Sequence, residues 1–88
     1  MADIGHRYSR KEILERLSAI LCDVFSLKKD DIDEDLKVGD SPKWDSLGHL
    51  TLFLQLESRM NVRFSAQEII ACRSVCQIAD RLEEKLSR

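Results

Sequence analysis

The chain has few of the residues that build turn-rich, disulfide-linked or metal-binding domains. Three glycines, one proline and 6% aromatic residues in 88 argue against a β-sandwich or barrel with many turns. The three cysteines (Cys22, Cys72 and Cys76) lack the paired spacing of zinc or redox motifs, so we expect small, buried thiols in a reducing cytoplasm. The two histidines complete no zinc set, and we predict no metal site.

The sequence also lacks an excess of charge of one sign and any long apolar run. Its net charge is −2 with both signs interspersed, which is a poor match for nucleic acid. No apolar run approaches a membrane span, and residues 1–6 show no secretory signal. We therefore expect a cytoplasmic monomer that binds neither nucleic acid nor a membrane. Its 88 residues suffice for one domain with a modest core rather than a roomy enzyme cleft.

The sequence does contain patterns that predict amphipathic helices with serine caps. Ser9, Ser65 and Ser74 each stand three residues before Glu or Gln, the signature of a capping box. Apolar residues then recur at helical spacing, most clearly over 13–25. We predict one domain over 1–88, with an N-terminal extension at 1–8 and helices at 9–25, 46–60, 65–72 and 74–87.

The segment between the first two helices, residues 26–44, breaks the helical periodicity. It contains an acidic run and then turn chemistry around Pro42. A loop of this length is unusual in so small a domain. We expect it to lie across the bundle, anchored by its own apolar residues, Leu27, Ile32, Leu36 and Val38. The predicted fold class is all-α: a four-helix bundle of three long helices and one short helix, with a long first loop.

The second long helix starts differently from the others, at Asp45 and Ser46. The residues three positions later are Gly48 and His49, and neither can complete a capping box. One interpretation is a plain N-cap. The other is a modified serine, because a phosphate on Ser46 would lie at the positive end of the helix dipole. Asp45 could then help a modifying enzyme to hold its magnesium ion.

The tripeptide Asp45-Ser46-Leu47 resembles the D-S-L core of the attachment motif of acyl carrier proteins. The resemblance covers roughly residues 10–87, including the long loop, Leu50, Leu54, Glu57, Phe64-Ser65, Ser74-Val75, Ile78 and Leu82. It implies that a phosphopantetheinyl transferase moves 4'-phosphopantetheine from coenzyme A to Ser46. The thiol of this arm would then carry acyl groups as thioesters to partner enzymes, while the protein itself catalyses nothing.

Several residues depart from the pattern of fatty-acid synthase carriers. Lys43 stands where many family members have glycine, and Glu57 is the only acid of the helix over 46–60, which is strongly acidic in those carriers. Complementary charge steers partners together, so this helix is a poor match for basic partner surfaces. Trp44 and the Gly48-His49 pair resemble the residues of carriers that serve specialised pathways. The resemblance therefore implies a stand-alone carrier of polyketide or other natural-product biosynthesis.

The helix over 46–60 has more apolar residues than one buried stripe needs. We expect some of them, such as Leu47 and Leu52, to face solvent, a partner or a ligand. Docking is predicted near Ser46, at Trp44, Leu47, His49 and Leu50. The expected partners are the transferase, an acyl- or aminoacyl-loading enzyme and downstream synthase enzymes.

Three other functions remain open on the sequence. The first is an aminoacyl or peptidyl carrier of nonribosomal peptide synthesis, with the same arm and different cargo. The second is a non-catalytic helical adaptor that binds a protein partner. The third is a hydrolase using Ser46, His49 and Asp45, but the chain has no G-x-S-x-G elbow and little room for a cleft.

Overall fold

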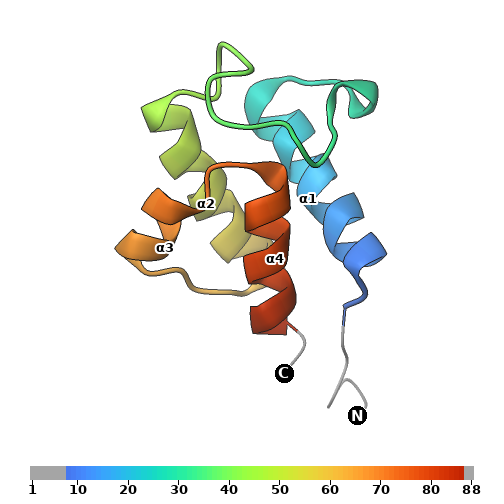
Figure 1. Cartoon of the computed structure of the whole chain (residues 1–88), viewed down its shortest axis with the longest axis vertical. Helices are drawn as coiled ribbons and strands as arrows, with labels where there is room; N and C mark the ends of the chain where they lie inside the picture. Colours follow the sequence, from blue (N-terminus) through green and yellow to red (C-terminus); the bar gives the residue numbers. More distant parts are fainter. Residues whose placement is uncertain (1–7, 87–88) are drawn as a thin grey trace.

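The computed structural model describes residues 8–86, which form four α-helices and one short 3-10 helix (Figure 1). The elements are α1 (Arg10–Phe25), η1 (Lys29–Asp31), α2 (Ser46–Met60), α3 (Ala66–Ala71) and α4 (Val75–Leu86). Three long helices and one short helix follow the predicted order, with the long loop after the first, so the predicted fold class is confirmed. The expected extension at 1–8 lies outside the described residues apart from Tyr8, as does the segment examined for a secretory signal.

Serine caps determine where α1 and α3 begin. Ser9 Oγ accepts from the Glu12 amide at 3.2 Å, and the Glu12 carboxylate accepts from the Ser9 amide at 2.9 Å. Ser65 and Glu68 form the same reciprocal pair at 3.1 and 2.8 Å. The cap residue itself is non-helical, so each helix begins one residue later than predicted. The hydrogen bond from the Ser65 amide, together with the Lys85 ammonium, lowers the pKa of Glu68.

The capping box predicted for α4 is only half formed. Ser74 Oγ accepts from the Gln77 amide at 3.1 Å, as expected. The Gln77 side chain, however, accepts from the Arg73 amide at 2.9 Å rather than from Ser74. The chain before α4 is paired with the long loop, through a bridge between Lys37 and Ser74, and this pairing sets the direction from which it enters the helix.

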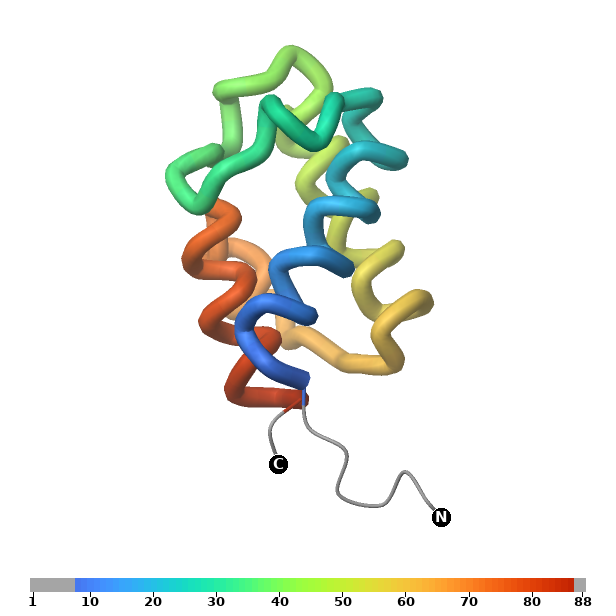
Figure 2. The backbone as a smooth tube through the Cα atoms, turned by 90° about the vertical axis from the view of Figure 1, so that its right-hand side faces the viewer, coloured from blue at the N-terminus to red at the C-terminus, as the bar shows by residue number. Residues whose placement is uncertain are grey.

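One apolar core fills the space between α1, α2 and α4. In Figure 2, α1 runs between α4 on one side and α2 on the other. The largest fully buried aliphatic and aromatic side chains of these helices are Ile13, Leu17, Leu21, Leu52, Phe53, Leu56, Ile78 and Leu82. Burying one such side chain stabilises the fold by about 1.5–3 kcal/mol. The core therefore explains why three helices of moderate length hold together.

The structure corrects the prediction for Leu52, which is fully buried rather than exposed. The helix α2 packs against α1 and also contacts α3 through His49, so it buries a wider face than one stripe. Leu47 does face solvent, as predicted, with 73% of its surface exposed.

The loop from residue 26 to residue 45 lies across one end of the bundle (Figure 1). Its four predicted anchors, Leu27, Ile32, Leu36 and Val38, are partly buried against the core, which confirms that expectation. Backbone hydrogen bonds hold it as well. The Val38 amide donates to the Arg73 carbonyl at 2.9 Å, and the Val75 amide donates to the Leu36 carbonyl at 2.8 Å. These bonds fix the loop to the corner between α3 and α4.

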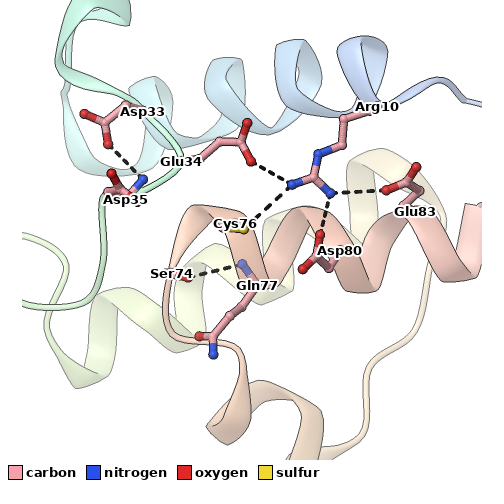
Figure 3. Close-up of polar contacts among 9 residues, drawn as sticks. All are labelled: Arg10, Asp33, Glu34, Asp35, Ser74, Cys76, Gln77, Asp80 and Glu83. Carbon is pink, nitrogen blue, oxygen red and sulfur yellow. Dashed lines mark hydrogen bonds and ion pairs between the residues drawn. The ribbon is translucent and has the colours of Figure 1, made fainter.

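A second tie between the loop and the helices is centred on Arg10 (Figure 3). Its guanidinium pairs with Glu34 of the loop at 2.7 Å and with Asp80 and Glu83 of α4 at 2.5 and 3.1 Å. The hydrogen bonds that the guanidinium donates to these carboxylates, to Glu34 above all, raise the pKa of Arg10 above its already high value. One side chain thus joins the start of α1, the loop and α4.

Candidate functional site

The first residues of α2 show which residue caps this helix. Asp45 is the N-cap: its Oδ1 accepts from the Gly48 amide at 2.8 Å, and its carbonyl accepts from the His49 amide at 2.8 Å. Ser46 is therefore the first helical residue rather than the cap. Its side chain is exposed, and no group within residues 8–86 hydrogen-bonds to its hydroxyl. The hydroxyl is thus free of any structural role that modification would disrupt.

A close approach between the loop and α2 places this helix start. The carbonyl oxygen of Lys43 lies where a Cβ at Gly48 would be, well inside van der Waals contact. The same Cβ would meet the ring of Phe25 at 3.0 Å. Glycine at position 48 therefore lets the loop pass against the first turn of α2. In the sequence, Gly48 stood out only because it cannot complete a capping box and because it precedes His49, and neither pattern indicates this packing role.

Trp44 and His49 are buried, so the prediction that they form docking contacts is wrong. Trp44 is fully buried and His49 is 6% exposed. Trp44 Nε1 can only donate, and it donates to His49 Nδ1 at 2.9 Å. The His49 proton is therefore on Nε2, which donates to the Ile69 carbonyl at 2.7 Å. This chain of hydrogen bonds joins the loop, α2 and α3 directly behind the start of α2.

Aromatic packing explains why these two side chains point inward. The Trp44 ring stacks on Phe25 of α1, with 5.2 Å between the ring centroids. The His49 ring meets the edge of Phe53 at 4.9 Å, and Phe53 in turn meets Phe64 at 4.9 Å. Such pairs stabilise beyond the area that they bury. The burial of Trp44 and His49 thus follows from aromatic partners distributed over the rest of the chain.

The geometry does not support the hydrolase hypothesis. Both ring nitrogens of His49 are engaged, one by Trp44 and the other by Ile69. A general base must offer a free nitrogen to the serine that it activates. Asp45 uses its carboxylate to cap α2 instead of orienting the imidazole. The three residues are close in sequence but form no catalytic arrangement.

The outward face of α2 is apolar and uncharged near Ser46. Leu47 and Leu50, two of the predicted docking residues, are 73% and 47% exposed. Leu54 on α2 and Ile70 on α3, which the sequence pattern did not indicate as surface residues, extend the exposed apolar surface. Residues 46–54 contain no formally charged side chain. The exposed surface of α2 next to Ser46 is therefore formed by leucines.

Neither a protein-family model nor a curated protein matches this sequence. A solved structure does match, that of an acyl carrier protein from Enterococcus faecalis, with a TM-score of 0.70 and 20% sequence identity. The match covers 89% of this chain and 99% of the other. The chain has the acyl carrier protein fold. At this level of identity, the likeness shows the fold alone.

Within the acyl carrier protein fold, Ser46 borders a surface pocket of about 220 Å³. The pocket lies between the first turns of α2, the end of α3 and the loop, and its other lining residues are Val38, His49, Leu50, Ile69, Ile70 and Arg73. The pocket is mostly apolar, with one arginine. It is the concave feature that the sequence could not indicate, because three separate segments form it.

Within residues 8–86, no group of three or more His, Cys, Asp or Glu side chains could hold a metal ion. Cys22, Cys72 and Cys76 are free thiols; Cys72 is buried as expected, whereas Cys22 and Cys76 are partly exposed. No helix in the described part of the chain combines the length and the apolar character needed to cross a bilayer.

Proposed function

We propose that this protein is an acyl carrier, which holds acyl intermediates as thioesters on a 4'-phosphopantetheine arm attached to Ser46. The observation that carries the proposal is the free, exposed hydroxyl at the first residue of α2, where Asp45 already supplies the cap. The acyl carrier protein fold supports it. The carrier itself would catalyse nothing and would act in the cytoplasm.

The electrostatics at the start of α2 favour a phosphodiester on Ser46. The amides of Ser46 and Leu47 find no acceptor among the described residues. Free amides and the positive end of a helix dipole stabilise a nearby anion by about 0.3–1 kcal/mol at an exposed position. The modified serine would thus carry its negative charge at a place suited to it.

Asp45 is the residue that would support modification. Its Oδ1 caps α2, and its Oδ2 accepts no hydrogen bond within residues 8–86. Carboxylate and phosphate oxygens are the ligands that magnesium prefers. Asp45 could therefore keep α2 capped with one oxygen and offer the other to the transferase's magnesium ion.

The charge pattern of α2 supports a carrier for polyketide or other natural-product biosynthesis. The only acid of the helix, Glu57, accepts a hydrogen bond from the Phe64 amide at 2.9 Å. The only base, Arg59, pairs with Asp23 of α1 at 2.7 Å. Both charges are engaged within the protein, so α2 presents no acidic surface to a basic partner. We propose docking through Leu47 and Leu50, which an aminoacyl- or peptidyl-loading enzyme could equally use.

Attachment of the arm is tested by intact mass. The protein is incubated with coenzyme A, magnesium and a promiscuous phosphopantetheinyl transferase, next to a known carrier. We expect a gain of one phosphopantetheine, which Ser46→Ala abolishes. Because the Ser46 hydroxyl has no partner within the described residues, the variant should keep the stability of the parent to within about 0.5 kcal/mol. No gain under conditions that modify the known carrier would reject the carrier function and favour a helical adaptor.

A further inference from the structure

The imidazole of His49 is held in its neutral form by the partners of its two ring nitrogens. The ring is buried, and Trp44 Nε1 donates to His49 Nδ1 at 2.9 Å. An indole nitrogen can only donate, so Nδ1 must be without a proton to accept this bond. Nε2 carries the proton and donates to the Ile69 carbonyl at 2.7 Å. A second proton on the ring would therefore leave Nδ1 and the indole facing each other as two donors.

The charged groups on the α3 side of the ring do not offset a second proton. Arg73, which follows α3, lines the same pocket as His49, and its guanidinium forms no ion pair with any residue of 8–86. A nearby charge of the same sign disfavours the imidazolium. Glu68 is the acid of α3, and it pairs with Arg81 and Lys85 of α4 at 3.7 and 3.1 Å. The one carboxylate of α3 is thus already neutralised by cations of α4.

The loop, α2 and α1 surround the ring with a cap and with aromatic side chains. Asp45 of the loop uses its carboxylate to cap α2. Residues 46–54 of α2 are uncharged, and Phe53 meets the edge of the imidazole with 4.9 Å between the ring centroids. Phe25 of α1 stacks on Trp44 at 5.2 Å. Among the described residues, the surroundings of the ring therefore favour the neutral imidazole over the charged one.

Trp44 links the protonation of His49 to the start of α2. Trp44 precedes Asp45, whose side chain caps the helix, and Asp45 precedes Ser46, the first helical residue. When the bond between the two rings is lost, Trp44 is still stacked on Phe25 of α1 but is no longer fixed to α2. The cap and the serine lie between these two attachments, so their geometry depends on the bond.

We propose that His49 is a proton-sensitive positioning residue for the modification of Ser46. This inference rests on the proposed attachment of the arm at that serine. Histidine side chains commonly change their charge between about pH 5 and 8. The ring borders a surface pocket, so solvent protons reach it without unfolding of the bundle. The neutral ring holds the cap and the hydroxyl in one geometry, in which the arm is attached. The charged ring displaces the start of α2, and attachment slows.

The hydrogen bond itself is followed by nuclear magnetic resonance of the unmodified protein between about pH 8 and 5. Trp44 is the only tryptophan, so a single indole N–H resonance reports on this bond. We expect that resonance to move toward the value of an unbonded indole as the pH falls. His49→Asn puts an amide oxygen near the position of Nδ1 and does not titrate, so its resonance should stay constant. A resonance that is constant in the parent, or that moves equally in His49→Asn, would overturn the inference.

The other histidine of the chain provides the matched control. His6→Asn makes the same substitution at a position outside the described residues, and its indole resonance should move as in the parent. A response that His6→Asn abolishes would belong to that histidine and would refute the role of His49. Circular dichroism of each variant establishes that the fold is retained.

The positioning role is tested by the rate at which the transferase adds phosphopantetheine, followed by intact mass against a known carrier in the same reaction. The ratio of the two rates removes the pH dependence of the transferase. Between about pH 7.5 and 5.5, this ratio should fall roughly two- to tenfold for the parent and for His6→Asn, as the loss of one hydrogen bond implies. It should stay constant for His49→Asn, and also for Trp44→Phe, which has no indole donor to lose.

The outcomes separate this inference from the proposed function. A constant ratio in a parent protein that is fully modified would overturn the positioning role and leave the carrier function intact. A ratio that falls equally in all four proteins would show an effect of pH elsewhere on the carrier and refute the role of His49. No mass gain at any pH, while the known carrier is modified, would reject the carrier function and the positioning role together.

Discussion

The hydrogen bond between Trp44 and His49 leads to a quantitative prediction about stability. Trp44→Phe keeps an aromatic ring on Phe25 but removes the donor to His49 Nδ1, which then lies buried without a partner. An unsatisfied buried polar group costs about 1–3 kcal/mol. For a domain of this size, 1 kcal/mol shifts the midpoint of thermal unfolding by about 4–8 °C. Trp44→Phe should therefore lower this midpoint by at least about 4 °C.

A double-mutant cycle separates this bond from the loss of ring volume. His49→Leu alone leaves the Trp44 indole N–H buried without an acceptor, and it also removes the donor to Ile69. The double variant Trp44→Phe/His49→Leu leaves neither half of the Trp44–His49 bond unsatisfied. We expect it to be more stable than the sum of the two single losses predicts, by about 1–3 kcal/mol.

The cycle is measured by urea unfolding followed by far-ultraviolet circular dichroism. Trp44 is the only tryptophan, so fluorescence would not report equally on all four proteins. Each change in side-chain volume, and the loss of the hydrogen bond to the Ile69 carbonyl, occurs in one single variant and again in the double variant. These effects therefore cancel in the coupling energy. Additive losses, to within about 0.3 kcal/mol, would show that the bond contributes nothing specific and would refute the proposed role of the buried pair.

Three further predictions concern the helix start, acid stability and docking. Gly48→Ala should lower the free energy of unfolding by about 1–3 kcal/mol through overpacking, because the new Cβ displaces the Lys43 carbonyl. The same displacement should slow modification of Ser46, and unchanged modification kinetics would contradict this. The pKa of Glu68 is lower in the folded than in the unfolded protein, so the stability that Glu68 contributes is present at neutral pH and is lost as the pH falls below about 4.5. Glu68→Gln should therefore reduce the loss of stability on the acid side of a pH–stability curve. An acid side unchanged by this variant would contradict the prediction. Leu47→Ser should lower the rate at which a partner enzyme turns over the carrier. With the parent protein, this rate should depend little on salt, because residues 46–54 carry no charge. A steep fall of the rate with salt would indicate that charged residues mediate docking.

The helix starts show how much of the fold the sequence could predict. The boxes at Ser9 and Ser65 depend on residues three apart, so they form wherever the helix forms, and both are present. The box at Ser74 is incomplete because the long loop pairs with the chain there, a contact across 37 residues of sequence. Local patterns thus predicted which segments are helical, and nonlocal contacts set the details of one terminus.

For the candidate site, the sequence indicated the position and missed most of its surroundings. Asp45, Ser46 and Leu47 stood out by their neighbours alone, and Leu47 and Leu50 are exposed as docking requires. Whether Asp45 or Ser46 caps α2 remained open, because both side chains can accept from the first turn.

Only the tertiary structure decided the remaining features, and the physical reason is the same for each. Trp44 and His49 are buried because Phe25 of α1 and the Ile69 carbonyl of α3 lie against them, and no local pattern contains those partners. Leu52 is buried as part of the same apolar core. The pocket beside Ser46 likewise forms where α2, α3 and the loop meet. The sequence determined the helices, the loop between them and the unusual serine. Long-range packing determined that this serine is free, that its neighbouring histidine is engaged, and that a pocket lies beside it.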